Sequence, residues 1–179
     1  MMEPQVVLVN ERDEPQGTTG KMEAHQRGLL HRALSVFLFD REGRMLLQQR
    51  AAGKYHGAGL WSNTCCSHPA PGEAPEAAAR RRLREELGIE ADLRPAFAFT
   101  YRAEVENDLI EHEYDHVFTG QYEGTFVLNP DEVAAVRYLG RAELERELSE
   151  QPERYTQWFR MIYGRVHDLW EKRFEGEHL

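Results

Sequence analysis

Four residues of this 179-residue chain form two pairs whose types and spacing suit metal chemistry. Cys66 and His68 are two positions apart, and so are Glu111 and Glu113. Side chains two apart on a strand point to the same face, so each pair is expected to share one face. The glutamates lie in an apolar and aromatic segment, where a carboxylate needs a partner. A divalent cation would supply one, and imidazole with carboxylate ligands suits Mn²⁺ or Zn²⁺ better than Ca²⁺.

Two upstream histidines, His25 and His31, add further candidate ligands. Each of these residues by itself also has an ordinary explanation. A single histidine or glutamate is usually solvated or hydrogen-bonded, and a lone cysteine is usually a small buried hydrophobic residue. The alternating polar residues of segment 111–115 are also typical of an exposed strand face. Only the joint pattern favours a metal centre.

Short strands are expected to position these residues, because apolar runs alternate along the chain with polar, glycine and proline clusters. The predicted strands are residues 6–9, 34–39, 44–50, 60–66, 96–104, 109–118, 122–128 and 133–139. The second and third of them flank a turn at 40–43 and are expected to form a hairpin. Residues 17–20 and the glycine-rich segment 51–60 are expected to be loops.

Three helical segments are predicted. Pro75 precedes a run of Ala, Arg, Leu and Glu over 76–87, and Gly88 follows it, which is typical of a capped helix. Residues 141–150 form the second, and the third begins at Pro152. Four apolar residues of the third lie near helical spacing: Trp158, Ile162, Val166 and Trp170. Strands around one central helix, with helices at the end, predict an α+β sandwich on a mixed sheet.

The composition resembles that of ordinary soluble globular chains, with 41% apolar and 30% charged residues. The length favours one domain over residues 1–179. No apolar run is long enough to cross a bilayer and residues 1–4 lack signal-peptide features, so we expect a cytoplasmic protein without a membrane partner. The net charge of -9 argues against nucleic acid as a partner. The adjacent Cys65 and Cys66 are expected to be free thiols.

Four segments resemble the type I isopentenyl-diphosphate isomerases of the Nudix superfamily, in the expected order. They are the cysteine segment 61–69, the modified Nudix helix 81–89, and segments 101–103 and 111–113. The resemblance extends from about Val6 to about Trp158. It implies a Nudix-like α/β/α sandwich with a mixed β-sheet and C-terminal helices. It also implies an isomerase that interconverts isopentenyl diphosphate and dimethylallyl diphosphate in isoprenoid biosynthesis.

The resemblance further implies two metal sites. The first would hold Mn²⁺ or Zn²⁺ with three histidines and two glutamates: His25, His31, His68, Glu111 and Glu113. In the second, Glu86 and the backbone carbonyl of Cys66 would hold a Mg²⁺ ion that arrives with the diphosphate. Mg²⁺ prefers oxygen ligands and is commonly shared with substrate phosphates. The step from His25 to His31 is six residues here and seven in a related enzyme.

Four basic residues match positions that the family uses to bind the diphosphate: Lys21, Arg50, Lys54 and Arg82. Guanidinium groups grip phosphate oxygens in pairs, and lysine offers a compact charge. Each also has a plainer interpretation. Arg82 and Glu86 are four apart on the predicted helix, and as a surface ion pair they would contribute only about 0.3 to 0.5 kcal/mol. The partner is therefore expected to be a small allylic or homoallylic diphosphate, bound by a monomer or a homodimer.

The implied reaction protonates the alkene at its terminal carbon, which forms a tertiary carbocation. A proton then leaves the carbon next to that cation, on the other face. Glu113, next to Tyr101, is the predicted proton donor, and Cys66 is the predicted base. Nearby metal and arginine charges are expected to favour the thiolate. Trp158 is predicted to face the carbocation with its ring, and a place in the core is the alternative.

A Nudix-type diphosphate hydrolase is the alternative function. Counted back from Gly88, the hydrolase pattern is matched at Glu73 and Arg81 but not at Ser67, where a glycine is expected, or at Arg82, where a glutamate is expected. A cation in place of a metal-binding carboxylate favours holding a diphosphate over cleaving it. A non-enzymatic metal-binding module is a more distant alternative.

Overall fold

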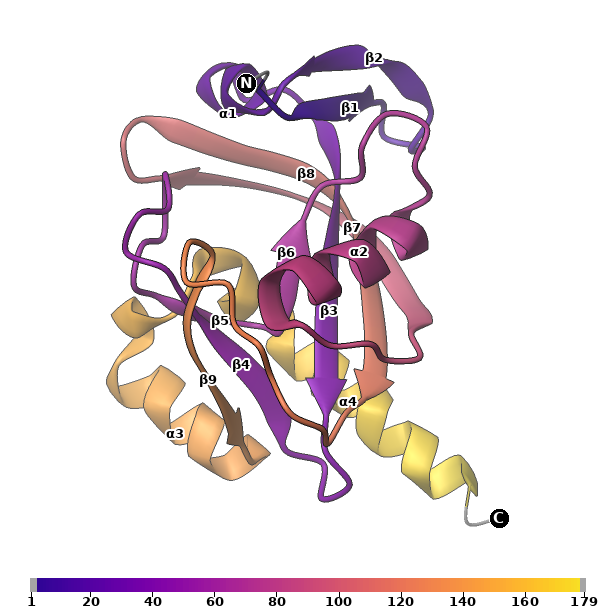
Figure 1. The fold of residues 1–179 in the computed structure, drawn as a ribbon, viewed down its shortest axis with the longest axis vertical. Helices are drawn as coiled ribbons and strands as arrows, with labels where there is room; N and C mark the ends of the chain where they lie inside the picture. Colours follow the sequence, from indigo (N-terminus) through magenta and orange to yellow (C-terminus); the bar gives the residue numbers. More distant parts are fainter. Residues whose placement is uncertain (1–2, 178–179) are drawn as a thin grey trace.

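A nine-stranded mixed sheet and its flanking helices make up the computed structural model, which describes residues 3–177 (Figure 1). The strands are β1 (Gln5–Val9), β2 (Pro15–Gly20), β3 (His31–Phe39), β4 (Met45–Arg50), β5 (Trp61–Ser62), β6 (Cys65–Ser67), β7 (Arg94–Val105), β8 (Leu109–Gln121) and β9 (Val133–Leu139). The helices are α1 (Lys21–Arg27), α2 (Pro75–Leu87), α3 (Arg141–Glu150), the 3-10 turn η1 (Pro152–Arg154) and α4 (Gln157–Glu177). Met1 and Met2, on which the expected absence of a signal peptide partly depends, lie outside the described residues.

Strand β3 is the centre of the sheet. It pairs in parallel with β8 along its whole length, and antiparallel with β6. β8 in turn pairs with β7, and β4 pairs with β5 and β9. The expected hairpin of β3 and β4 is paired only at Phe39 and Met45, next to the turn. Beyond that point the two strands diverge, because the short strands β5 and β6 fill the space between them.

The residues of β3 alternate between two hydrophobic cores. Leu34, Val36 and Leu38 pack against α2 on one face, whereas Phe37 and Phe39 pack against α4 on the other. Figure 1 shows α2 in front of the sheet and α4 behind it. Burying each such side chain stabilises the fold by roughly 1.5 to 3 kcal/mol. The predicted α/β/α sandwich with C-terminal helices is therefore confirmed.

Two elements near the start of the chain differ from the prediction. Residues 17–20, expected to be a loop, belong to β2, which pairs antiparallel with β1. The strand is polar and mostly exposed, so no apolar alternation marks it in the sequence. Helix α1 was not predicted, because its seven residues are too few to show a clear helical periodicity. Gly28, with φ 65°, caps its C-terminal end.

The strand predicted at residues 122–128 is wrong. The amide of Val127 donates to the carbonyl of Leu87 at 3.0 Å, and that of Asn129 donates to the carbonyl of Glu86 at 2.9 Å. Carbonyls in the last turn of a helix lack intrahelical partners, so this segment caps α2 instead of joining the sheet. The strand predicted at 60–66 is divided into β5 and β6, which pair with β4 and β3.

The other predicted elements are confirmed within a few residues at their ends. In the last segment, Pro152 begins a 3-10 turn and the α-helix starts at Gln157. The four residues at helical spacing are all buried: Trp158, Ile162, Val166 and Trp170. None of the helices in the described part of the chain is long and apolar enough to cross a membrane.

Candidate active site

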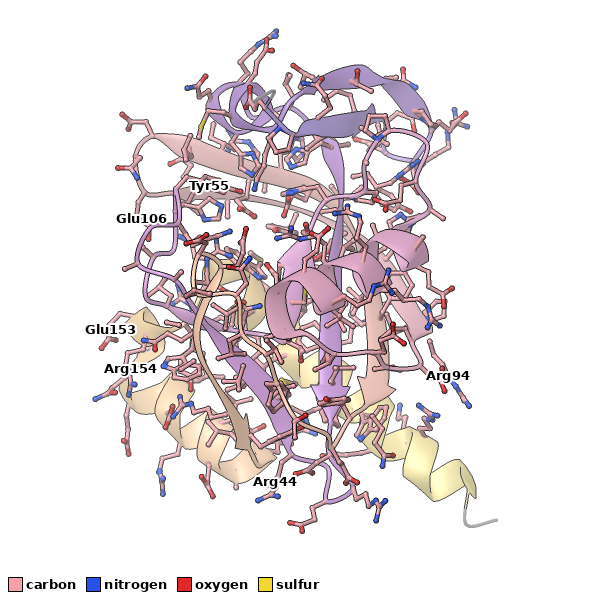
Figure 2. The ribbon with its side chains drawn as sticks, viewed as in Figure 1. Arg44, Tyr55, Arg94, Glu106, Glu153 and Arg154 are labelled. Atoms are coloured by element: carbon pink, nitrogen blue, oxygen red, sulfur yellow. The ribbon has the colours of Figure 1, made fainter. Side chains whose placement is uncertain are left out.

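A small cavity of about 40 Å³ lies beside β3, where α1, α2, β4, β6, β7, β8 and α4 approach one another. Most of the residues predicted to form the site line it: Lys21, Arg50, Lys54, Cys66, His68, Arg82, Tyr101, Glu111, Glu113 and Trp158. His25 and His31 lie behind its wall, in contact with the same glutamates. Figure 2 labels Tyr55, another lining residue, on the connection between β4 and β5.

Strand register assembles the first group of candidate metal ligands. Parallel pairing of β3 and β8 sets His31 directly opposite Glu113. The Nε2 atoms of His31 and His68 lie 3.0 and 2.7 Å from Glu113 Oε2. His25 joins them, and the ligand atoms of all four residues lie within 4.8 Å of one another. Glu111 lies two residues before Glu113 on the same face of β8, as the spacing predicted.

Backbone carbonyls orient two of the imidazole rings. His25 Nδ1 donates to the carbonyl of Lys21 at 2.7 Å, and His31 Nδ1 donates to that of Leu29 at 2.8 Å. A ring that donates from Nδ1 turns Nε2 toward the cluster as a possible ligand atom. His25 Nε2 is buried and has no hydrogen-bond partner within residues 3–177. Because such an atom costs roughly 1 to 3 kcal/mol, the donor set fits a divalent cation.

The electrostatics of the cluster favour a charged Glu113. Burial would raise the pKa of this carboxyl, but the charges and hydrogen bonds of His68 and His31 outweigh burial and hold the pKa well below its usual range. Burial lowers the pKa of His68 to about 4. Burial also raises the pKa of Tyr101 well above its ordinary value, so the phenol keeps its proton. That phenol donates to Glu111 Oε2 at 2.7 Å and contacts Glu113.

The two adjacent cysteines face opposite sides of the sheet, as their strand positions predicted. Cys65 is fully buried on the α2 side, where its thiol lies 2.9 Å from Glu86 Oε2. Cys66 lines the cavity with His68. Its thiol donates to Asn63 Oδ1 at 3.0 Å and accepts from Trp158 Nε1 at 3.1 Å.

The expected stabilisation of the Cys66 thiolate is not provided by the protein groups. Burial, reinforced by the nearby Asp115, raises the pKa of the thiol to about 12. The charge of Arg50 opposes this shift but is too weak to reverse it. Desolvation therefore outweighs the arginine charge, one of the two charges on which the sequence-based argument relied, so Arg50 alone does not favour the thiolate.

The four basic residues form what we call the basic wall: Lys21, Arg50, Lys54 and Arg82. Burial and the neighbouring cations lower the pKa of Lys21 to about 8. Arg82 Nε is buried without a hydrogen-bond partner in the described residues. A lysine that loses its proton easily and a buried donor without an acceptor both indicate a place for an anion.

Arg82 and Glu86 do not form the surface ion pair that was the alternative. Arg82 Nη2 lies 3.1 Å from Glu86 Oε1, and the two side chains are only 19% and 4% exposed. Glu73 and Arg81, the positions that match the hydrolase pattern, form a two-point ion pair with both N–O distances at 2.9 Å. That pair ties the preceding loop to α2 and leaves Arg82 directed at the cavity.

The exposed-face interpretation of segment 111–115 is wrong, because Glu111, Glu113 and Asp115 are all buried. Sequence reasoning did not identify Asp115 as part of the site. It accepts a hydrogen bond from Ser35 at 2.7 Å, and burial raises its pKa well above the usual range. The available signal was the spacing of residues 111, 113 and 115, because side chains two apart share one face of a strand. The pattern alone does not say whether that face is buried or exposed.

The Trp158 ring belongs to the α4 core and also lines the cavity, so the core interpretation is confirmed and the role beside the carbocation stays a prediction. His56, another lining residue, was missed. It lies in the glycine-rich segment 51–60, where loop composition gives no indication of burial. The one available signal was its position two residues after Lys54.

The fold is that of a Nudix protein. The NUDIX domain model matches residues 29–159. The crystal structure of DR0079 from Deinococcus radiodurans has the same fold, with a TM-score of 0.68 and 22% identity, over 82% of this chain and 90% of that one.

Curated relatives identify a narrower group. Isopentenyl-diphosphate Delta-isomerase 2 of Aromatoleum aromaticum is 54% identical over 165 residues, which span 92% of this chain and 87% of that protein. Isopentenyl-diphosphate Delta-isomerase of Burkholderia multivorans is 51% identical over 165 residues, which span 92% of this chain and 94% of that protein. The chain therefore belongs to the isopentenyl-diphosphate Delta-isomerases, within the Nudix family.

Proposed function

We propose that this chain interconverts isopentenyl diphosphate and dimethylallyl diphosphate and leaves the diphosphate intact. One observation carries the proposal: Cys66 and Glu113, two groups able to exchange protons, line the same cavity as the basic wall. Within that wall, Arg82 stands where a Nudix hydrolase has a glutamate. The arrangement suits binding of a diphosphate beside a site of proton transfer.

The metal assignment belongs to the same proposal. Mn²⁺ or Zn²⁺ would be held by the three histidines and two glutamates of the cluster: His25, His31, His68, Glu111 and Glu113. Glu86 and the backbone carbonyl of Cys66 would hold the Mg²⁺ that accompanies the diphosphate. When bound, these ions would neutralise buried carboxylates and phosphate oxygens and lower the pKa of neighbouring groups. The unpartnered nitrogen of His25 supports the first site.

The other residues of the site have separate tasks. The basic wall would bind the phosphate oxygens, with Arg82 Nε as a donor that requires an acceptor. Tyr101 would hold Glu111 and Glu113 in place through its hydroxyl. Trp158 would present its ring to the five-carbon chain and to the positive charge that develops on it.

Cys66 and Glu113 would act as the two proton-transfer groups. Burial raises the pKa of the Cys66 thiol, and His68 and His31 lower the pKa of Glu113. Without the metal charges, these shifts favour the thiol as donor and the carboxylate as acceptor, which is the reverse of the roles that the sequence suggested for the direction toward dimethylallyl diphosphate. Because the interconversion is reversible, the group that donates in one direction accepts in the other. The pair therefore supports both directions, provided that protons exchange with solvent between turnovers.

We also propose that residues 1–179 act as one domain in the cytoplasm, as a monomer or homodimer, with no nucleic-acid or membrane partner. The net charge of -9 and the small size of the site support a small-molecule substrate.

Isomerase and hydrolase differ in what they release. Purified protein with Mg²⁺ and isopentenyl diphosphate is expected to form dimethylallyl diphosphate, detected by chromatography, without releasing phosphate or diphosphate. Phosphate release without that product would favour the Nudix hydrolase instead. Bound metal with neither product would favour a non-enzymatic module.

A further inference from the structure

His56 is a buried histidine that neither strand register nor the family resemblance connects to the site. It lies on the connection between β4 and β5, and its residue is only 3% exposed. Both ring nitrogens are buried and have no hydrogen-bond partner in the described part of the chain. A buried imidazole usually satisfies at least one nitrogen, so this ring requires an explanation.

The His56 ring points at the glutamate that the cluster shares. Its Nε2 lies 2.5 Å from Glu111 Oε1 without the geometry of a hydrogen bond, and His25 Nε2 lies 3.7 Å from the same oxygen. Ligand atoms of His25, His56 and Glu111 all lie within 4.8 Å of one another. Two imidazole nitrogens that converge on one carboxylate oxygen are a donor arrangement that suits a divalent cation.

The backbone on both sides of His56 is fixed. Arg50 donates to the carbonyl of His56 from Nε and Nη2, at 3.3 and 3.1 Å. The amide of Gly57 donates to Glu106 Oε2 at 3.0 Å, and its φ of 62° allows the turn. Figure 2 shows Tyr55 and Glu106 near one another on this side of the molecule. The connection therefore holds the ring in place before any ligand binds.

The two groups of possible ligands share one histidine. His25 belongs to the group with His56 and also to the group with His31, His68 and Glu113. Its Nδ1 is used by the carbonyl of Lys21, so only Nε2 remains as a ligand atom. A single lone pair binds a single ion, and the two groups must therefore share it.

We propose that His56 is a sixth ligating side chain of this metal centre, giving it four imidazoles and two carboxylates. The inference rests on the metal site proposed above. Imidazole ligands favour Co²⁺ and Zn²⁺ over Mn²⁺ and Mg²⁺. His56 therefore shifts the selectivity of the centre toward Co²⁺ and Zn²⁺.

The test is metal binding by protein freed of metal with a chelator. Affinities for Co²⁺ and Mn²⁺ are measured by competition with a chromophoric chelator, and the visible spectrum of the Co²⁺ form reports its ligands. In His56→Gln we expect the affinity for Co²⁺ to fall about tenfold or more and the affinity for Mn²⁺ to fall less. The visible spectrum of the Co²⁺ form should also change. His116→Gln is the control, because that ring pairs with Asp13 outside the cluster. It is expected to bind both metals as the unaltered protein does.

A role in positioning Glu111 would give a different result. Glutamine can still hydrogen-bond to that carboxylate, so a positioning role predicts equal small losses for both metals and an unchanged Co²⁺ spectrum. That result would overturn the proposal. His56→Ala supplies a second test, since free imidazole is expected to restore its Co²⁺ affinity, and failure to do so counts against ligation. If the unaltered protein bound no Co²⁺ or Mn²⁺, the metal centre itself would be wrong.

Discussion

The histidine–glutamate cluster and the basic wall meet at one cavity but are held in opposite ways. In the cluster, imidazole nitrogens and carboxylates are fixed by strand register and by backbone carbonyls, and His25 Nε2 has no hydrogen-bond partner among the described residues. In the wall, Lys54 pairs with Glu132 and Arg82 pairs with Glu86. The cluster is preformed for a cation, whereas two of the four cations of the wall are held in internal ion pairs.

The space beside the cavity adds to this contrast. A larger pocket of about 320 Å³ adjoins this cavity and shares Lys21, His68 and Arg82 with it. Binding of a diphosphate would exchange the carboxylate partners of Lys54 and Arg82 for phosphate oxygens. The metal ligands need no such rearrangement. Changes in the cluster should therefore affect metal content and turnover together, and changes in the wall should affect mainly substrate binding.

Loss of the metal is expected to have the largest effect. Chelation should abolish turnover, and His68→Ala and Glu111→Gln should each lower the bound transition metal, because each removes a ligand from the cluster. Elemental analysis of the purified variants measures this directly. Unchanged metal content in both variants would show that these residues are ordinary buried, hydrogen-bonded side chains and not metal ligands.

The two thiols provide the next test. Cys66→Ala should lower turnover by about 10² to 10⁴, the usual range for loss of a positioned acid or base. Cys65→Ser is the matched control and should keep most activity, because a serine hydroxyl can still donate to Glu86. Rates are measured with isopentenyl diphosphate under reducing conditions. Loss of activity in the Cys65 variant alone would show that the wrong thiol was assigned.

A smaller effect is expected in the basic wall. Arg82→Gln should raise KM for isopentenyl diphosphate by about 10- to 100-fold with metal content unchanged, since hydrogen bonds to charged groups contribute roughly 1.5 to 3 kcal/mol. Arg84→Gln is a suitable control, because that arginine lies on the exposed face of the same helix. A fall in transition-metal content in the Arg82 variant would contradict the separation of the two regions.

The pH dependence of binding should be the smallest effect. Lys21 is charged below its pKa of about 8 and loses its charge above it, so kcat/KM should fall severalfold as the pH rises through 8. In Lys21→Arg the guanidinium stays charged, and the fall should move to higher pH. Identical profiles for the two proteins would exclude Lys21 as the group that titrates.

Strand periodicity explains how much of the cluster the sequence could predict. A period of two was enough to separate Cys66 from Cys65 and to put Glu111 and Glu113 on one face. It does not indicate which strands are neighbours, so the pairing of His31 with Glu113 became known only from the parallel register of β3 and β8. The ligand set itself came from the family resemblance.

The misses have physical causes of the same kind. Helix α1 and strand β2 are short and polar, so their sequences show no clear periodicity. Contacts with the rest of the fold stabilise them instead. The connection that carries His56 is held by hydrogen bonds from Arg50 to the His56 carbonyl and from the Gly57 amide to Glu106 in the β7–β8 turn, and the second of these joins segments that are distant in sequence. The charge state of Cys66 depends on desolvation, which residue type and spacing do not reveal.

Proton transfer without loss of phosphate is the central claim, and one measurement tests it most directly. The protein is incubated in deuterated water with Mg²⁺ and isopentenyl diphosphate, and both the five-carbon product and free phosphate are analysed from the same tube. Because Glu113 and Cys66 exchange protons with solvent between turnovers, mass spectrometry should detect deuterium in the carbon skeleton, with no phosphate or diphosphate released. Stoichiometric release of phosphate with no deuterium in the carbon skeleton would contradict the account.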